Sequence, residues 1–343
     1  MGTRPTIADL AKAAGVSVAT VDRVLNQRHP VREGTAERVL RAAEAIDFHA
    51  TALIRQRIRE GVPVRTFGFL LQKRADVFYQ QLGVDLAAAT RERHDIRGKP
   101  VVDFIDELSP ATIAERMMEM GSRVDALAVV SVDHPHVSLA IERLRDRGVP
   151  TVAIISDLTA EARAAYIGHD NRKEGRTAAW IIAKTAKKPG KIGIIVGSHR
   201  YLCQETAEIS FRSYFREHAT EFRLLEPLVN LEDPRIAYEA TLDMMERNQD
   251  LVGLYICGGG MVGVIEAARE EATHEPVAVV CNELTADTRA ALIDGTLTAV
   301  ISTRTGPVAA STVDAMVRAL ETPATNNPAQ ILISFDLHIA ENV

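Results

Sequence analysis

Polar side chains follow several short apolar runs of this sequence, at places where a strand would end. They carry carboxylate, amide, hydroxyl, imidazole and guanidinium groups, which form the hydrogen bonds that hold a polyhydroxylated or anionic small molecule in a cleft. Each one alone is more typical of a solvated loop or a helix cap, so the hypothesis of a binding cleft rests on their shared placement. The residues are Ser131, Asp133, Asp157, His169, Asp170, Asn171, His199, Arg200, Asn282 and Glu283.

A glycine-rich stretch, CGGGMVG at 257–263, places Gly258, Gly260 and Gly263 in the spacing G-x-G-x-x-G, with Glu283 after the next apolar run. This spacing is typical of a loop that holds a dinucleotide phosphate at the start of a helix. The stretch lies late in the chain, whereas such a loop normally follows the first strand of its fold. A glycine-rich turn beside a polar ligand explains the same residues, and a nicotinamide-dependent enzyme is the rival hypothesis.

The sequence lacks the motifs of the common catalytic and metal-binding sites. The sequence has no nucleophile elbow, no H-E-x-x-H, no Walker lysine and no closely spaced carboxylate pair, so we expect neither an enzyme nor a cofactor. The cysteines Cys203, Cys257 and Cys281 lie far apart, which favours neither a disulfide framework nor a zinc site. Because the sequence also has no long apolar stretch and no signal-peptide core, we expect a cytoplasmic protein.

The elements that must position the polar residues alternate between strand and helix from Arg65 onward. Alternation of this kind predicts parallel sheets covered on both faces, and its length predicts two similar lobes with a cleft between them. Ligands of such sheets bind beyond the carboxyl ends of the strands. Strands are expected at 66–71, 101–105, 125–131, 151–155, 191–196, 251–257, 277–281 and 298–302, and helices at 79–93, 135–147, 172–187, 234–247 and 306–320.

The stretch 6–26, TIADLAKAAGVSVATVDRVLN, has the spacing of a helix-turn-helix. Ala11 is small where the helices meet, Gly15 permits the turn, and Val21 is apolar where the second helix crosses the first. Ser17 is expected to cap the second helix, whose first turn would present Val18, Ala19 and Thr20, with Arg23 on the same side, to a DNA major groove. An ordinary two-helix hairpin is the alternative.

Charge and the next two segments favour contact with DNA. The first 60 residues hold ten Lys and Arg against seven Asp and Glu, a balance of +3, while the rest carries −9 to give the total of −6. A third helix is expected at 35–46, with Thr35 as its cap, after a turn at 26–34. A short helix at 51–58 is too brief to be stable alone, so it is either a linker or a segment that folds on DNA.

The chain resembles the lactose-repressor (LacI/GalR) family of bacterial transcription regulators. The stretch 6–26 and VREGTAERV after it carry the resemblance in the head, and TFGFLL, VDALAVV, GVPTVAII, YIGHDN, SFRSYF, GLYICGGG and CNELTADTRAALIDG carry it in the body. The family's effector domain shares the fold of periplasmic sugar-binding proteins. The resemblance therefore implies a homodimer that binds a near-palindromic operator and a small-molecule effector.

Carried over by position, the resemblance implies roles for individual residues. Val18, Ala19 and Arg23 would contact bases, Thr6, Ser17, Thr20, Asn26 and Thr35 would contact phosphates, and a hinge helix with Leu53 and Arg57 would enter the minor groove. Phe78, Asp157, Asp170, Asn171 and Glu283 would contact the effector, and the strand-end residues Ser131, Asp133 and Arg200 complete the expected effector set. The chain departs from the family at Asp22 (usually serine), Arg57 (usually leucine) and Ala207 (usually a ligand-binding arginine).

Together these observations predict a small all-α helix-turn-helix head and an α/β body of two doubly wound parallel-sheet lobes, of the type I periplasmic-binding-protein kind. The expected domains are a head at 1–50, a hinge helix and linker at 51–63, and a body at 64–343. Its amino-terminal lobe would comprise about 64–165 and 302–325, and its carboxyl-terminal lobe about 166–301 and 326–343. The expected function is a sequence-specific DNA-binding regulator, a repressor controlled by a sugar, polyol or sugar acid. The alternatives are a solute-binding protein without regulatory role and an NAD-dependent oxidoreductase using Gly258–Gly263.

Overall fold

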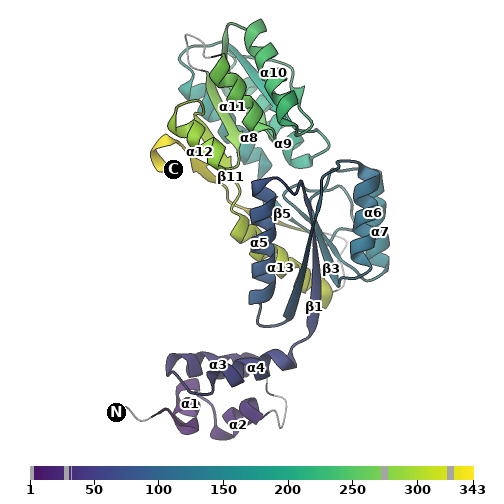
Figure 1. The fold of residues 1–343 in the computed structure, drawn as a ribbon, viewed down its shortest axis with the longest axis vertical. Helices are drawn as coiled ribbons and strands as arrows, with labels where there is room; N and C mark the ends of the chain where they lie inside the picture. The colour runs from purple at the N-terminus through teal and green to yellow at the C-terminus, as the bar shows by residue number, and fades with distance from the viewer. Residues whose placement is uncertain (1–3, 27–30, 32, 272–276, 323–327) are drawn as a thin grey trace. The chain divides into compact units, whose positions relative to one another are not determined.

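The computed structural model describes residues 4–26, 31, 33–271, 277–322 and 328–343 (Figure 1). Contacts between residues divide the chain into two compact units, one of residues 1–65 with 91–99 and one of 66–90 with 100–343. The turn expected at 26–34 lies largely outside the described residues. Within the described residues, no helix is long and apolar enough to cross a membrane.

Four helices build the first unit, which we call the head: α1 (Ile7–Ala14), α2 (Val18–Asn26), α3 (Glu33–Ala45) and α4 (Thr51–Gly61). Their apolar faces meet in one core, where Leu10, Val21, Val39 and Ile54 are fully buried. The helix α3 begins at Glu33, so the expectation that Thr35 caps it is wrong, and Thr35 lies inside the first turn.

The helix α4 is part of this core, because the Ile54 side chain packs among residues of the other head helices. The Thr51 hydroxyl donates to the carbonyl of Phe48 (2.6 Å), and Arg55 pairs with Glu44 on α3 (2.5 Å). The sequence-based expectation that this segment needs an outside partner for its order is therefore wrong. Neighbouring helices of the same chain supply the packing that an isolated short helix lacks.

The second unit holds two parallel sheets, each with helices on both faces. We call the first six-stranded sheet and its helices the first lobe; its strand order is β12-β5-β4-β3-β1-β2. Its elements are β1 (Val64–Gln72), α5 (Val77–Glu92), β2 (Arg97–Ile105), α6 (Pro110–Gly121), β3 (Ala126–Val129), α7 (Pro135–Asp146), β4 (Thr151–Ile154), β5 (Ala165–His169), α13 (Thr305–Glu321) and β12 (Ala329–Ile333).

The second lobe is built on a seven-stranded sheet of order β13-β11-β10-β9-β6-β7, with β8 also paired to β6. Among the strands of this sheet, β13 pairs antiparallel with β11. Its elements are α8 (Asn171–Thr185), β6 (Lys191–Val196), α9 (Leu202–His218), β7 (Arg223–Leu224), β8 (Leu228–Val229), α10 (Pro234–Arg247), β9 (Leu251–Cys257), α11 (Met261–Glu270), β10 (Ala278–Asn282), α12 (Ala286–Ile293), β11 (Ala299–Ser302), β13 (Asp336–His338) and a short 3₁₀ turn (Ala340–Asn342).

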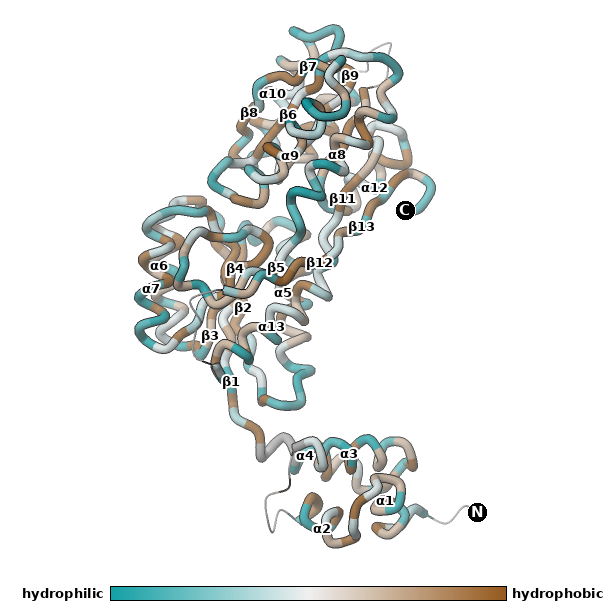
Figure 2. The backbone as a smooth tube through the Cα atoms, turned by 180° about the vertical axis from the view of Figure 1, so that it is seen from behind, coloured by the Kyte–Doolittle hydropathy of each residue, from teal (hydrophilic) through white to brown (hydrophobic). Residues whose placement is uncertain are grey.

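Helices cover each sheet because its strands are apolar on both faces. In the second lobe, α8 and α9 pack on one face around Phe211 and Tyr255, and α10, α11 and α12 pack on the other around Leu254 and Leu292. In the first lobe, α6 and α7 cover one face and α5 and α13 the other (Figure 1). Figure 2 shows the hydrophobic stretches gathered in central strands such as β4, with hydrophilic loops around them.

The strand pairing differs from the expected lobe boundaries in two places. The strand β5 pairs with β4, and β12 pairs with β5, so both belong to the first lobe although the sequence-based boundaries put residues 166–301 and 326–343 in the second. The chain passes between the lobes after β5, after β11 and after β12. Strand carboxyl ends from both lobes therefore lie near these crossings, which is where a ligand of such a fold binds.

Candidate functional site

The second helix of the head presents an exposed first turn. Gly15 ends α1 in the left-handed conformation (φ +64°), and the backbone N–H of Thr20 donates to the Ser17 hydroxyl (3.2 Å), as expected for a cap. Val18 is 52% exposed, and Ala19 and Arg23 are also exposed, because Val21 and its neighbours turn the opposite face of α2 into the core. Apolar and cationic side chains thus lie together on a free helix face, which suits a DNA major groove.

The head residues expected at phosphates also form local hydrogen bonds. The Thr6 side chain caps α1 by accepting from the Asp9 backbone N–H (3.3 Å), and the Ser17 and Thr20 hydroxyls lie 2.9 Å apart. Asp22, the acidic departure from the family pattern, accepts from the Asn26 amide (2.6 Å).

Three further residues were expected at DNA from the resemblance. Thr35 is half-buried in α3, while Leu53 on α4 is 41% exposed and Arg57 on the same helix is half-buried. Their contacts with DNA remain predictions.

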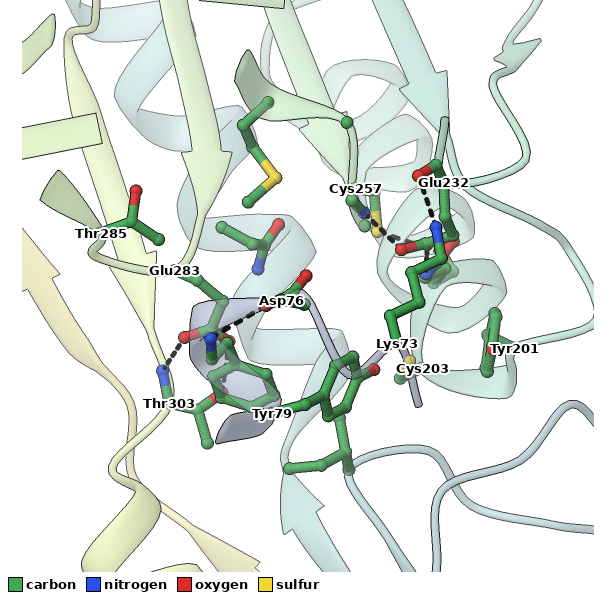
Figure 3. A pocket seen from close by; sticks show the side chains of 18 of the residues that line it. Lys73, Asp76, Tyr79, Tyr201, Cys203, Glu232, Cys257, Glu283, Thr285 and Thr303 are labelled. Atoms are coloured by element: carbon green, nitrogen blue, oxygen red, sulfur yellow. Dashed lines mark hydrogen bonds between the residues drawn. The ribbon is translucent and has the colours of Figure 1, made fainter. Parts of the chain in front are cut away.

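A cavity of about 450 Å³ lies in the second unit, between its two lobes, and matches the size of small-molecule sites. Its walls come from loops at the carboxyl ends of β1, β4, β5, β9, β10 and β11, with the start of α5 and of α9 (Figure 3). The polar lining residues are Lys73, Asp76, Tyr79, Ser156, His169, Asn171, Glu174, Tyr201, Gln204, Glu232, Asn282, Glu283, Thr285, Asp287 and Thr303.

Glu174 organises one wall of this pocket. Its buried carboxylate accepts from the amides of Asn282 (2.6 Å) and Asn171 (3.2 Å), and it lies 3.5 Å from Nδ1 of His169. Burial alone would lower the pKa of His169, but the hydrogen bond to Glu174 and the charges of Glu174 and Glu283 outweigh it and raise that pKa. The network leaves two buried atoms without a partner in the described protein, Nε2 of His169 and Oδ1 of Asn282. Both residues line the pocket.

Glu283 occupies another wall, directly after β10. Its backbone is in the left-handed region (φ +65°), and its carboxylate accepts from the Thr303 hydroxyl (2.5 Å) and the Thr303 N–H (3.0 Å), as Figure 3 shows. Burial raises the pKa of Glu283 to about 7, although the bonds to Thr303 act in the opposite direction. The positive φ, costly for a residue other than glycine, holds this side chain at the pocket.

Glu232 explains the glycine-rich stretch. Its carboxylate accepts from the Gly259 N–H (2.9 Å) and from the Gln204 amide (2.6 Å), and its carbonyl accepts from Lys73 of the first lobe (2.5 Å; Figure 3). A Cβ on Gly259 would lie 2.2 Å from the Glu232 carboxylate, and one on Gly263 would lie 1.8 Å from the carbonyl of Pro234. Close packing therefore accounts for these glycines, and the Gly259 amide that a phosphate would use already binds a carboxylate.

The structure brings together some of the expected effector residues. Phe78, Asn171 and Glu283 line the pocket, together with His169 and Asn282. Their roles as ligand contacts remain predictions.

The other expected effector residues lie outside the described pocket lining. Asp157 forms an ion pair with Arg163 (2.7 Å), Asp133 accepts from the N–H of Thr159 (2.9 Å), and Asp170 caps α8. Ser131 is buried and donates to the carbonyl of Val132, while Arg200 is exposed. Asp157 and Asp133 thus stabilise loops, as strand-end polar residues commonly do, and Asp170 stabilises the start of a helix.

Position 207 shows why a motif position does not always transfer. Ala207 is fully buried in the core between α8 and α9, and a Cβ on Gly175 would lie 2.0 Å from its carbonyl. The pocket is reached one turn earlier on α9, by Gln204.

The sequence-based reasoning also missed Lys73, Glu174, Gln204 and Glu232. Glu174 and Gln204 lie within helices and not at strand ends, which are the positions that the apolar runs indicate. For Glu174 the available signal was its place four residues after Asp170, on the first turn of the helix that follows β5.

Two family profiles match this chain: the periplasmic binding protein domain over residues 67–323, and the lacI family of bacterial regulatory proteins over residues 6–50. An uncharacterized HTH-type transcriptional regulator in the aml 5′ region of Streptomyces limosus is 27% identical over 283 residues, covering 79% of this chain and 76% of the relative. The HTH-type transcriptional regulator MalR of Streptomyces coelicolor is 28% identical over 203 residues, covering 57% of this chain and 55% of the relative.

Among solved structures, an ABC transporter solute-binding protein from Agrobacterium vitis, bound with α-D-tagatopyranose, superposes with a TM-score of 0.74. It is 17% identical in sequence, and the match covers 81% of this chain and 95% of that one. The likeness shows that the second unit has the periplasmic-binding-protein fold.

The helix-turn-helix head and the two-lobed body together define a DNA-binding transcriptional regulator. The chain belongs to the lacI family of bacterial regulatory proteins, with a periplasmic binding protein domain as its body.

Proposed function

We propose that this regulator is a repressor that binds a near-palindromic operator as a homodimer in the cytoplasm and releases or tightens on it when a sugar or polyol occupies the pocket. The observation that carries the proposal is the pairing, in one chain, of an exposed first turn on α2 with a pocket whose walls come from two lobes. The first feature suits DNA, and the second suits a small ligand.

The chemistry of the pocket supports a hydroxylated ligand. Phe78 and Tyr79 supply aromatic surface, and the side chains of Asn171, Asn282 and Glu283 supply hydrogen-bonding groups. Sugars offer both apolar ring faces and hydroxyl groups, so they fit a lining of this kind. The α-D-tagatopyranose bound to the Agrobacterium vitis protein is a ligand of the same chemical class.

Control of DNA binding by the ligand requires a preference for one arrangement of the lobes. A ligand that contacts both lobes favours the arrangement in which all its contacts form, and DNA then binds more or less tightly according to the same equilibrium. Lys73 already bridges the lobes through the Glu232 carbonyl. A ligand would add to, or compete with, that bridge.

Selection from a random duplex library tests DNA recognition. We expect the full chain to enrich one near-palindromic sequence and to sediment as a dimer on it. The control is Val18→Glu, which puts a carboxylate on the exposed turn of α2 without touching the core and should remove the enrichment. Enrichment of no sequence by the unmodified chain, or equal enrichment by Val18→Glu, would contradict the proposal.

A further inference from the structure

The charges that line the pocket are strongly unequal. Five carboxyl groups line it, against one lysine and His169, whose pKa is raised, and no arginine is among the described lining residues. The carboxylates belong to Asp76, Glu174, Glu232, Glu283 and Asp287. A carboxylate or phosphate on a ligand would therefore approach a wall of like charge.

Two of the five carboxylates are already compensated within the protein. Glu174 faces His169 and two amides, and Glu232 accepts from Gln204 and Gly259. The ammonium of Lys73 is directed to a backbone carbonyl. These groups form the frame of the pocket, so they do not select the charge of a ligand.

Glu283, like Glu232, accepts only from neutral groups within the described residues, and the charge of His169 favours its ionised form. Its two oxygens accept from the N–H and the hydroxyl of Thr303, a neutral residue. A carboxylate removed from water without a cation is unstable, and its charged form is favoured when a cation comes within a few ångströms. Asp76, which accepts from the Phe78 N–H, and the exposed Asp287 add negative charge to the same pocket, and neither forms an ion pair among the residues that the structure describes.

Two buried hydrogen-bonding atoms of the pocket residues have no partner within the described residues. The Asn282 amide nitrogen donates to Glu174, which leaves its Oδ1 as an acceptor. Nε2 of His169 also lacks a partner within the described residues, although His169 is only 6% exposed. This nitrogen accepts a hydrogen bond in the neutral ring and donates one in the protonated ring that Glu174 favours.

We propose that the effector is a hydroxylated amine, an amino sugar or amino polyol, whose ammonium lies against the Glu283 carboxylate and whose hydroxyls form hydrogen bonds with Asn282 and His169. The inference rests on the proposed function, because it narrows the effector class of the same pocket. The proposal excludes sugar acids, which the sequence analysis kept as one possible class of effector.

Calorimetry with matched ligand series tests this assignment on the full chain. Each series shares one carbon skeleton: D-glucamine, D-glucitol and D-gluconate; D-glucosamine, D-glucose and D-glucuronate; D-galactosamine, D-galactose and D-galacturonate. In at least one series we expect the amine to bind about tenfold or more tightly than the neutral compound, and the acid not to bind, because a charged hydrogen bond is stronger than a neutral one.

The variant Glu283→Gln keeps the size of the side chain and removes its charge. It should reduce amine affinity by about tenfold and leave that of the neutral compound unchanged, whereas Glu115→Gln on the exposed face of α6 should change neither. If Glu283→Gln does not fold, Asp76→Asn takes its place and should weaken the amine in the same direction.

Several outcomes overturn the assignment. The first is a neutral compound or an acid that binds as tightly as the amine of its series. The second is a preference for the amine that persists in Glu283→Gln. The third is that no amine binds. Operator affinity measured in the same samples distinguishes a failure of the amine assignment from a failure of the proposed function. A neutral polyol that binds and shifts operator affinity overturns the amine assignment and leaves the regulator with its sugar-type effector.

Discussion

Glu283 combines a left-handed backbone, a raised pKa and a place on the pocket wall. The sequence indicated this residue as a ligand contact through its position after an apolar run. It could not indicate the partner Thr303, which comes from the next strand and meets Glu283 only because β10 and β11 are neighbours in the sheet.

The raised pKa of Glu283 predicts how stability depends on pH. The folded protein keeps this carboxyl protonated up to about pH 7, while the unfolded chain releases the proton near its ordinary pKa, so stability is lost as pH rises through that window. His169 and Glu174 interact electrostatically with Glu283, so the difference in stability between the unmodified protein and a Glu283 variant is the useful quantity.

We expect Glu283→Gln to gain stability relative to the unmodified protein between pH 5 and pH 8, by on the order of 1 kcal/mol. Urea unfolding of both proteins at several pH values measures the gain. A constant difference across this range would show that Glu283 titrates as an ordinary exposed carboxyl.

Arg23 is exposed on α2, six positions after the capping Ser17. Arginine commonly pairs with guanine through two hydrogen bonds, so Arg23→Ala should cost ~1–3 kcal/mol of operator affinity and relax the preference at one half-site position. Binding to single-base operator variants at fixed salt measures this, with Arg145→Ala on α7 as the control. Uniform weakening across all variants would instead identify a phosphate contact.

At the scale of elements, α4 shows the limit of reasoning from length alone. Eight apparent helical residues looked too few, but the helix is longer than expected and Ile54 packs into the core of the head. Tertiary packing of this kind depends on residues of α2 and α3, which a local pattern does not include.

The packing of α4 gives a matched pair of variants. Ile54→Ala removes a fully buried side chain and should destabilise the head by ~2–5 kcal/mol, whereas Leu53→Ala on the exposed side should change its stability by less than about 0.5 kcal/mol. Thermal unfolding of the full chain, followed by circular dichroism, measures both. Equal effects of the two substitutions would mean that α4 does not pack as described.

The glycine-rich stretch and Gly306 give a second matched pair of variants. Gly263→Ala places a methyl 1.8 Å from the Pro234 carbonyl and should destabilise the second lobe by about 1–3 kcal/mol, because backbone must move. Gly306→Ala, with nothing within 4 Å of the new methyl, should be neutral or slightly stabilising. Denaturant unfolding compares the two, and tolerance of Gly263→Ala would reopen a ligand-binding explanation for the stretch.

Periodicity located the central strands and their parallel arrangement, since buried strands form continuous apolar runs. It missed the short β5, which is fully buried, and the two-residue strands β7 and β8. It also missed β12 and β13, which lie near the end of the chain and are partly exposed, so their pattern is weak. It found Asn282 and Glu283 at strand ends but not Glu174 and Gln204. A helix residue enters the pocket only through the way its helix packs, which the local sequence does not reveal.

At the scale of the molecule, the pocket is the feature that links two lobes. Lys73, Asp76 and Phe78 approach it from the first lobe, and Asn282 and Glu283 from the second. A ligand that binds both sets has different affinities for different lobe arrangements, and this difference is the only free energy available to change DNA binding.

The most direct test is the reciprocity of ligand and operator binding. Operator affinity is measured with and without saturating ligand, and ligand affinity with and without saturating operator, using the tightest ligand of the matched series. We expect both affinities to change by the same factor, on the order of 5- to 150-fold, because the coupling free energy belongs to both events. Unchanged operator affinity when the pocket is saturated would contradict ligand control of DNA binding.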